Sequence, residues 1–234
     1  MAFIEELDNF RMEEEAAQQY FFGYLSLQMI PGSNPEVLAK LNDTPAFWIT
    51  TRYALLQSAF VALGRIFDQD AKSIHNIDKL LRAVSDEVAL FTPIALASRR
   101  VATGMSHTAA SSYAAGKYTL TFDDIRAMRK AVDKWRKVYA DRYRDVRHLV
   151  FAHRGIPRSQ IDAIMGKTSV DEMKEILGFL HALFLSLDEL HKNGRPPDLT
   201  PRKFVLPPSP ASGGPATAGE RVYRESMDLQ YGML

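Results

Sequence analysis

A basic segment near the middle of the chain holds the residues whose types and spacing could do chemistry on a phosphate group. Arg147 and His153 are separated by five residues, in the run RHLVFAH. Between residues 126 and 158 there are eleven basic and three acidic side chains, a local charge of +8 in a chain whose net charge is +1. Arginine is a permanent cation that binds phosphate oxygens through a forked guanidinium, and histidine exchanges a proton near neutral pH. The pair therefore indicates phosphate chemistry.

Cleavage of RNA, the reaction implied by the family resemblance described below, is one that such a pair can carry out without a metal ion. The ribose 2′-hydroxyl is the nucleophile, so the protein has to supply a base, an acid and a cation on the phosphorane. We assign His153 as the acid and base and Arg147 as the phosphate clamp. Supporting or phosphate-binding roles fall to Arg144, Asp145, His148 and Arg154. We expect neither a cofactor nor a metal, and the histidines show no metal-ligand spacing.

Each of these side chains also has an ordinary structural alternative. His153 shares a stripe with Val146 and Leu149, as a core or interface histidine would. Arg147, Arg144 and Arg154 could be solvated or ion-paired cations, and Asp145 could pair with one of the neighbouring cations. His148 comes four residues after Arg144 and three after Asp145, so a local side-chain pair is its alternative role.

The helix that must carry the pair is expected to run from about residue 122 to about residue 153. A capping box opens it at Thr121 and Asp124, and Gly155 and Pro157 stop it. Positions six apart on a regular α-helix point about 120° away from each other. One such helix cannot aim both side chains at one phosphate. Either the helix unwinds at its end, or two copies of it pack about a two-fold axis and form a composite site.

The rest of the chain shows helical spacing nearly throughout, which predicts an all-α bundle with long antiparallel helices. We expect further helices at about 3–30, 35–41, 45–67, 74–84, 86–103, 158–165 and 170–192. The helix at 45–67 should be central, and residues 104–120 should form a loop or a poorly formed helix. Residues 1–193 are expected to make a single domain.

Residues 194–234 are expected to form a Pro/Gly-rich flexible tail. Seven of the twelve prolines lie between residues 194 and 220, a composition typical of extended or disordered chain. The last piece, residues 221–234, has apolar residues that could dock onto the body or onto a partner, or could merely trail.

Composition limits the class of protein. The 234 residues are 46% hydrophobic, which is ordinary for a globular protein, and none is cysteine, which excludes a disulfide framework and a thiol nucleophile. The first residues are acidic rather than those of a secretory signal, and no apolar run approaches the length of a membrane span. We expect a soluble, cytoplasmic protein without a membrane partner.

The motif resembles that of the HEPN superfamily of helical prokaryotic proteins. Arg147 is followed by a polar residue, His148, and the distance to His153 is within the family range. RHLVFAHRG and the earlier segment FWITTRYALLQSAFVALGRIFDQDAKSIHNIDKLL are similar to the AbiU2-like group linked to phage abortive infection. The resemblance covers roughly residues 40–190. In one HEPN subgroup a tyrosine two residues after the histidine is modified by a nucleotidyltransferase; Gly155 stands at that position here, so this regulation is not expected.

This resemblance implies a HEPN-like fold, a homodimer with both motifs near the two-fold axis, and a metal-independent endoribonuclease acting on RNA. It places the protein in antiphage defence or toxin–antitoxin growth control, with an antitoxin or a defence-system protein as a possible partner. Other members keep the fold without known catalysis. The alternative function is therefore a non-catalytic scaffold that binds RNA or protein.

Overall fold

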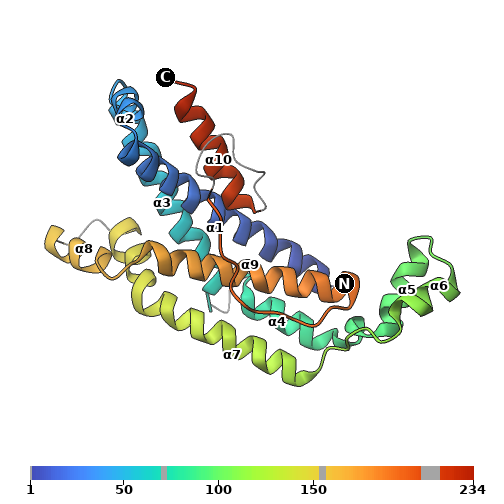
Figure 1. The fold of residues 1–234 in the computed structure, drawn as a ribbon. Coiled ribbons are helices and arrows are strands. Elements are labelled where there is room, and N and C mark those ends of the chain that lie inside the picture. The colour runs from blue at the N-terminus through green and yellow to red at the C-terminus, as the bar shows by residue number, and fades with distance from the viewer. Residues whose placement is uncertain (1, 70–72, 153–156, 207–216) are drawn as a thin grey trace.

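The computed structural model describes residues 2–69, 73–152, 157–206 and 217–234, and over these ranges the protein is built of helices without a strand (Figure 1). The predicted all-α class is confirmed. The helices are α1 (Ala2–Ser33), α2 (Pro35–Leu41), α3 (Pro45–Phe67), α4 (Ile77–Asp86), η1 (Val88–Phe91), α5 (Pro93–Ala102), α6 (His107–Ala114), α7 (Phe122–Val138), η2 (Tyr139–Tyr143), η3 (Val146–Ala152), α8 (Arg158–Met165), α9 (Val170–Asn193) and α10 (Ala218–Tyr231).

Helix α1 is the centre of the packing. It contacts α3, α4, α9 and α10 along its length. Its apolar residues recur every three or four positions, so one face is continuously buried, as Phe3, Leu7 and Phe10 show. The core continues between α4, α7 and α9, where Trp135 stacks on Phe179 with ring centres 5.8 Å apart.

Helix starts follow the capping signals of the sequence at most positions. The side chain of Asn34 accepts hydrogen bonds from the amides of Glu36 and Val37, ahead of the proline that opens α2. Thr121 and Asp124 form the expected reciprocal capping box at the start of α7. Thr44 precedes α3 as expected, but its side chain makes no capping hydrogen bond.

Three expectations about residues 45–120 need correction. The helix at 45–67 is buried only from Ala59 onward; its N-terminal half meets α1 and α2 on one side and leaves its other side chains exposed. The helix expected at 86–103 is two helices, since Pro93 cannot continue the 3₁₀-helix η1 and instead opens α5 after the cap residue Thr92. Residues 104–120 contain a regular helix, α6, which pairs with α5.

The long helix that carries the motif changes its geometry before it ends. It is α-helical to Val138 and then widens into the π-helical turns η2 and η3. Such turns, with hydrogen bonds from residue i to i+5, are rare and frequently lie at functional sites. The prediction of one regular α-helix to residue 153 is therefore wrong for its last third.

The C-terminal region returns to the body. Residues 195–206 run back across α9, where the amide of Asp198 donates to Ser186 Oγ and the amide of Arg202 donates to the carbonyl of Gly178. Helix α10 then packs on α1 (Figure 1). Of the alternatives left open for the last residues, docking onto the body is the one that the structure shows. The described residues 217–234 are thus not a flexible tail.

None of the described helices combines the length and the apolar character that crossing a bilayer requires.

Candidate functional site

The motif residues Arg147 and His148 lie on η3, which packs against α3. Phe151 anchors this contact, because its ring meets Phe60 at 5.4 Å and Tyr53 at 5.5 Å between ring centres. Aromatic pairs of this kind contribute about 1 kcal/mol each beyond the area they bury. The π-helical segment is therefore held on α3 by side chains of the motif's own helix.

The guanidinium of Arg147 rests on Gly64, a buried residue in the last turns of α3. A methyl group at position 64 would lie 2.7 Å from both Cδ and Cζ of Arg147, and closer still to Nη1. Real Cβ atoms do not approach other atoms this closely. The missing side chain of Gly64 thus leaves the space in which the half-buried side chain of Arg147 lies.

Arg147 also meets its neighbour in sequence. The Nη2 of Arg147 lies 3.0 Å from Nε2 of the exposed His148. A guanidinium can only donate, so Nε2 has to be the acceptor, which requires a neutral His148 ring with its proton on Nδ1. His148 therefore takes part in a local side-chain pair, as its structural alternative supposed, but with Arg147.

A buried phenol, that of Tyr139, lies near the charges of Arg144 and Arg147. The Tyr139 ring stacks on Phe67, and its hydroxyl has no hydrogen-bond partner among the described residues. Burial raises the pKa of Tyr139, and the nearby charges of Arg147 and Arg144 lower it by less. The phenol accordingly keeps its proton at neutral pH.

Of the supporting residues expected from the sequence, Arg144, Asp145 and His148 lie within the described ranges and Arg154 does not. Arg144 is exposed and Asp145 is half-buried, and within the described ranges none of Arg144, Asp145 and Arg147 forms an ion pair. His153 and Arg154 lie outside the described residues. The structure thus places the arginine of the pair and its surroundings, while the histidine stays a prediction.

The π-helical turn η2, just before Arg144, is tied to the start of α9. The hydroxyl of Tyr143 donates to the carbonyl of Ser169 at 3.1 Å, and Arg142 pairs with Glu172. Burial raises the pKa of Tyr143. Tyr143 points into the core, whereas Arg142 is exposed.

Gly64 and Tyr139 were not among the expected site residues. Gly64 lies in the apolar last part of α3, and its contact with Arg147 gives it a role in the site. Tyr139 carries no sequence signal for a part in the site. The available signal was the glycine itself. A glycine inside a helix is about 1 kcal/mol less favourable than alanine, so its presence indicates that another group packs closely against that position.

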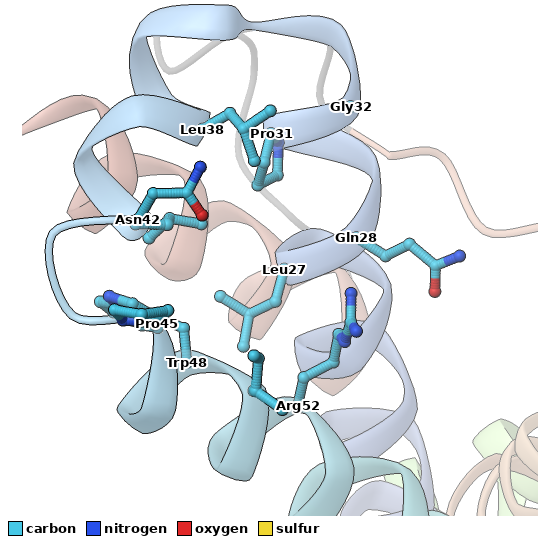
Figure 2. Close-up of a pocket in the computed structure, with 11 residues that line it drawn as sticks. Leu27, Gln28, Pro31, Gly32, Leu38, Asn42, Pro45, Trp48 and Arg52 are labelled. Atoms are coloured by element: carbon cyan, nitrogen blue, oxygen red, sulfur yellow. The ribbon is translucent and has the colours of Figure 1, made fainter.

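A surface of exposed apolar side chains adjoins η3 on the N-terminal half of α3. Phe47, Ile49 and Tyr53 are 62%, 60% and 45% exposed, and Tyr53 contacts Phe151 of η3. The same helix end borders a pocket of about 250 Å³ between α1, α2 and α3, with Trp48 on its wall (Figure 2). Exposed apolar surface of this kind is typical of a contact with another protein or another copy.

A comparison with protein families places the chain. The family model described as AbiU2, of the HEPN group, matches residues 2–206, which is most of the chain. No curated protein and no solved structure matches it significantly. The family match ends before α10.

Proposed function

Because the chain belongs to the AbiU2 family of HEPN proteins, we propose that it is a metal-independent endoribonuclease of abortive infection or growth control. The observation that carries the proposal is the position of Arg147. Its guanidinium lies against α3 in the space left by Gly64, has no described carboxylate partner, and lies at the end of the basic helix beside further cations. An arginine held close to a helix, with no carboxylate of the described residues beside it, is suited to a phosphate ligand.

The chemistry requires a proton acceptor and a proton donor around that phosphate. In the proposed step His153 removes the proton of the 2′-hydroxyl, and O2′ attacks phosphorus while the bond from phosphorus to the 5′-oxygen breaks. The leaving 5′-oxygen then takes a proton from the protonated imidazole of His153, so the products are a 2′,3′-cyclic phosphate and a 5′-hydroxyl. Arg147 binds the non-bridging oxygens, and such a contact contributes roughly 3–4 kcal/mol to the transition state.

A homodimer is the arrangement that brings Arg147 and His153 to one phosphate. The exposed apolar side chains Ile49 and Tyr53 support it, because they are four residues apart on one face of α3 and Tyr53 contacts Phe151 of η3. An isologous contact through this face would bring two motifs toward the axis, so that arginine and histidine come from different protomers. The alternative, a scaffold that binds RNA without cleaving it, uses the same cations.

The test is RNA cleavage by the purified protein in EDTA. We expect cleavage that Arg147→Ala and His153→Ala each reduce by about a hundredfold or more, with helix content and oligomeric state unchanged. His107→Ala is the matched control, since His107 begins α6, far from the motif in the fold. If all four proteins leave RNA intact but bind it, the scaffold alternative replaces the nuclease.

A further inference from the structure

A groove between α7, α9 and the returning C-terminal segment lies away from the motif. Its volume is about 560 Å³. Its lining has four basic side chains, two acidic ones and a floor of apolar ones, in the order Lys134, Trp135, Asp171, Lys174, Glu175, Thr200, Pro201, Arg202, Lys203 and Phe204. Of these cations only Lys134 belongs to the basic helix that is evident in the sequence; Lys174, Arg202 and Lys203 come from segments far along the chain.

The walls of this groove are fixed. On one side the backbone of Arg202 lies directly on α9, where its amide donates to the carbonyl of Gly178 at 3.0 Å. Gly178 has no room for a side chain, since a Cβ there would lie 3.3 Å from that same amide nitrogen and closer to the carbonyl oxygen of Arg202. On the floor, Trp135 is buried against Phe179. A cavity whose rim is held by backbone contacts is preorganised for a ligand.

Charge in the groove favours an anion. Lys174 pairs with Asp171 at 3.5 Å, so Glu175 is the one carboxylate of the lining that no described cation pairs with. Three cations of the lining, Lys134, Arg202 and Lys203, likewise form no ion pair with a described residue, so unpaired positive charge exceeds unpaired negative charge in the groove.

The excess positive charge continues along α7 outside the groove. Lys130, Lys134 and Lys137 are spaced by four and three residues, are exposed, and therefore share one face of the helix. A row of cations at this spacing that leads into a fixed groove matches a chain of phosphates better than a single small anion.

The groove has no open aromatic face. Trp135 is covered by Phe179 and by the ammonium of Lys134, which lies 4.9 Å from its ring centre. Phe204 is packed with Phe22 at 4.7 Å between ring centres. Bases therefore cannot stack here, and binding has to go through the sugar-phosphate backbone without sequence preference.

We propose that this groove, together with the lysine row of α7, binds the backbone of a single RNA strand on one side of the cleavage site. The choice of RNA rests on the proposed function, because the groove and the motif share one helix. Lys134 precedes Arg147 by thirteen residues on this helix, which is at most about 20 Å along its axis. This separation is short enough for one strand of several nucleotides to contact both.

The test measures binding apart from cleavage. The full chain is titrated with a fluorescent 2′-O-methyl oligoribonucleotide of about 16 nucleotides, a length at the upper end of single-strand site sizes, which has no free 2′-hydroxyl and so cannot be cleaved by the proposed step. For the triple variant Lys134→Gln, Lys174→Gln and Lys203→Gln we expect affinity to fall about tenfold or more. The slope of log K against log salt should decrease by about 2, since each lost phosphate contact of a single strand contributes about 0.7.

Two further variants separate a specific groove from general charge. Lys40→Gln, Arg82→Gln and Arg221→Gln remove the same charge from exposed positions outside the groove and the lysine row, and should leave the slope unchanged. Glu175→Gln removes the unpaired carboxylate and should tighten binding by a few fold. A role of the groove in folding alone would predict no such gain.

The outcomes are distinct from those for the nuclease. Loss of binding in the triple variant, with the control normal, supports the groove even if no RNA is cleaved. Equal salt slopes for the triple variant and the control overturn it, even if cleavage at Arg147 and His153 is established. Poly-glutamate is the second ligand to be titrated. If it binds as tightly as the oligonucleotide, and if the triple variant weakens both to the same degree, the groove is a site for an acidic protein segment and the RNA assignment is overturned.

Discussion

Arg147 lies in a space that exists because residue 64 is glycine. The two residues are far apart in sequence, on α3 and on η3, and the contact between them sets the position of the motif arginine. The site therefore depends on a residue that carries no functional group.

Gly64→Ala should reduce RNA cleavage by about tenfold to a hundredfold, because a displacement of the arginine by about 1 Å is enough for an effect of this size. Stability should change by less than about 1–2 kcal/mol, since the gain in helix propensity opposes the crowding. Cleavage rates and urea denaturation measure the two effects. Gly32→Ala is the matched control, because no atom lies within 4 Å of a Cβ at that helical position. Equal rates for Gly64→Ala and wild type would show that the position of Arg147 does not matter.

Mixing two inactive variants should restore activity. If Arg147 of one protomer and His153 of the other act on one phosphate, a mixed dimer of Arg147→Ala and His153→Ala has one intact site and one with neither residue. Full exchange of subunits gives half of the dimers this composition, so about a quarter of the wild-type rate is expected. Cleavage that stays at the level of the single variants after proven exchange would mean that each site lies within one chain.

The free energy of unfolding should fall as the pH is lowered, in a way that depends on His191. Burial, and next the charge of Arg99, lower the pKa of His191 to about 4, whereas an unfolded histidine titrates near 6.5. Between these values the unfolded chain binds more protons, so stability rises with pH from about 4 to about 6.5 and is lost as the pH falls. The ring lies beside Phe3 and Phe91, so His191→Leu should keep the packing and flatten this part of the profile. Urea denaturation at several pH values measures it, and parallel profiles would contradict the assignment.

The docking of helix α10 on α1 should be weakened by one added methyl group, that of Gly219→Ala. Gly219 lies on the ring of Phe22, where a Cβ would come within 2.8 Å of Cε2, and its amide donates to Gln18 Oε1 at 3.2 Å. Gly219→Ala should cost about 1–3 kcal/mol of docking energy and speed amide exchange in Ala218–Tyr231. Exchange in α7 should not change. Unaltered protection of α10 would show that the ring of Phe22 moves aside at little cost.

Helix starts that depend on a capping side chain nearby in the sequence were predicted correctly. Asn34, Thr121 and Ser169 mark helix starts because their side chains bond to amides two or three residues ahead, and these helices begin where expected. Periodicity likewise identified the buried face of α1. The motif's π-helical turns carry no such signal, because Tyr139, Tyr143 and the residues around them are compatible with an ordinary α-helix.

Features that depend on distant contacts could not be predicted. A stretch rich in proline and glycine indicates disorder, and its composition does not show that Ser186 and Gly178 of α9 bond to it or that α1 has a face for α10. The place of Arg147 depends on Gly64 for the same reason. The types and spacing of Arg147 and His153 indicated the chemistry. The space at Gly64 in which Arg147 lies arises only from the packing of η3 on α3.

The chemical nature of the RNA ends tests the central claim most directly. RNA of defined sequence is incubated with the protein in EDTA, and the 3′ ends of the products are determined by mass spectrometry. Attack by the 2′-hydroxyl under control of Arg147 and His153 predicts 2′,3′-cyclic phosphates, absent with His153→Ala. Intact RNA, or 3′-hydroxyl ends beside 5′-phosphates, would contradict it.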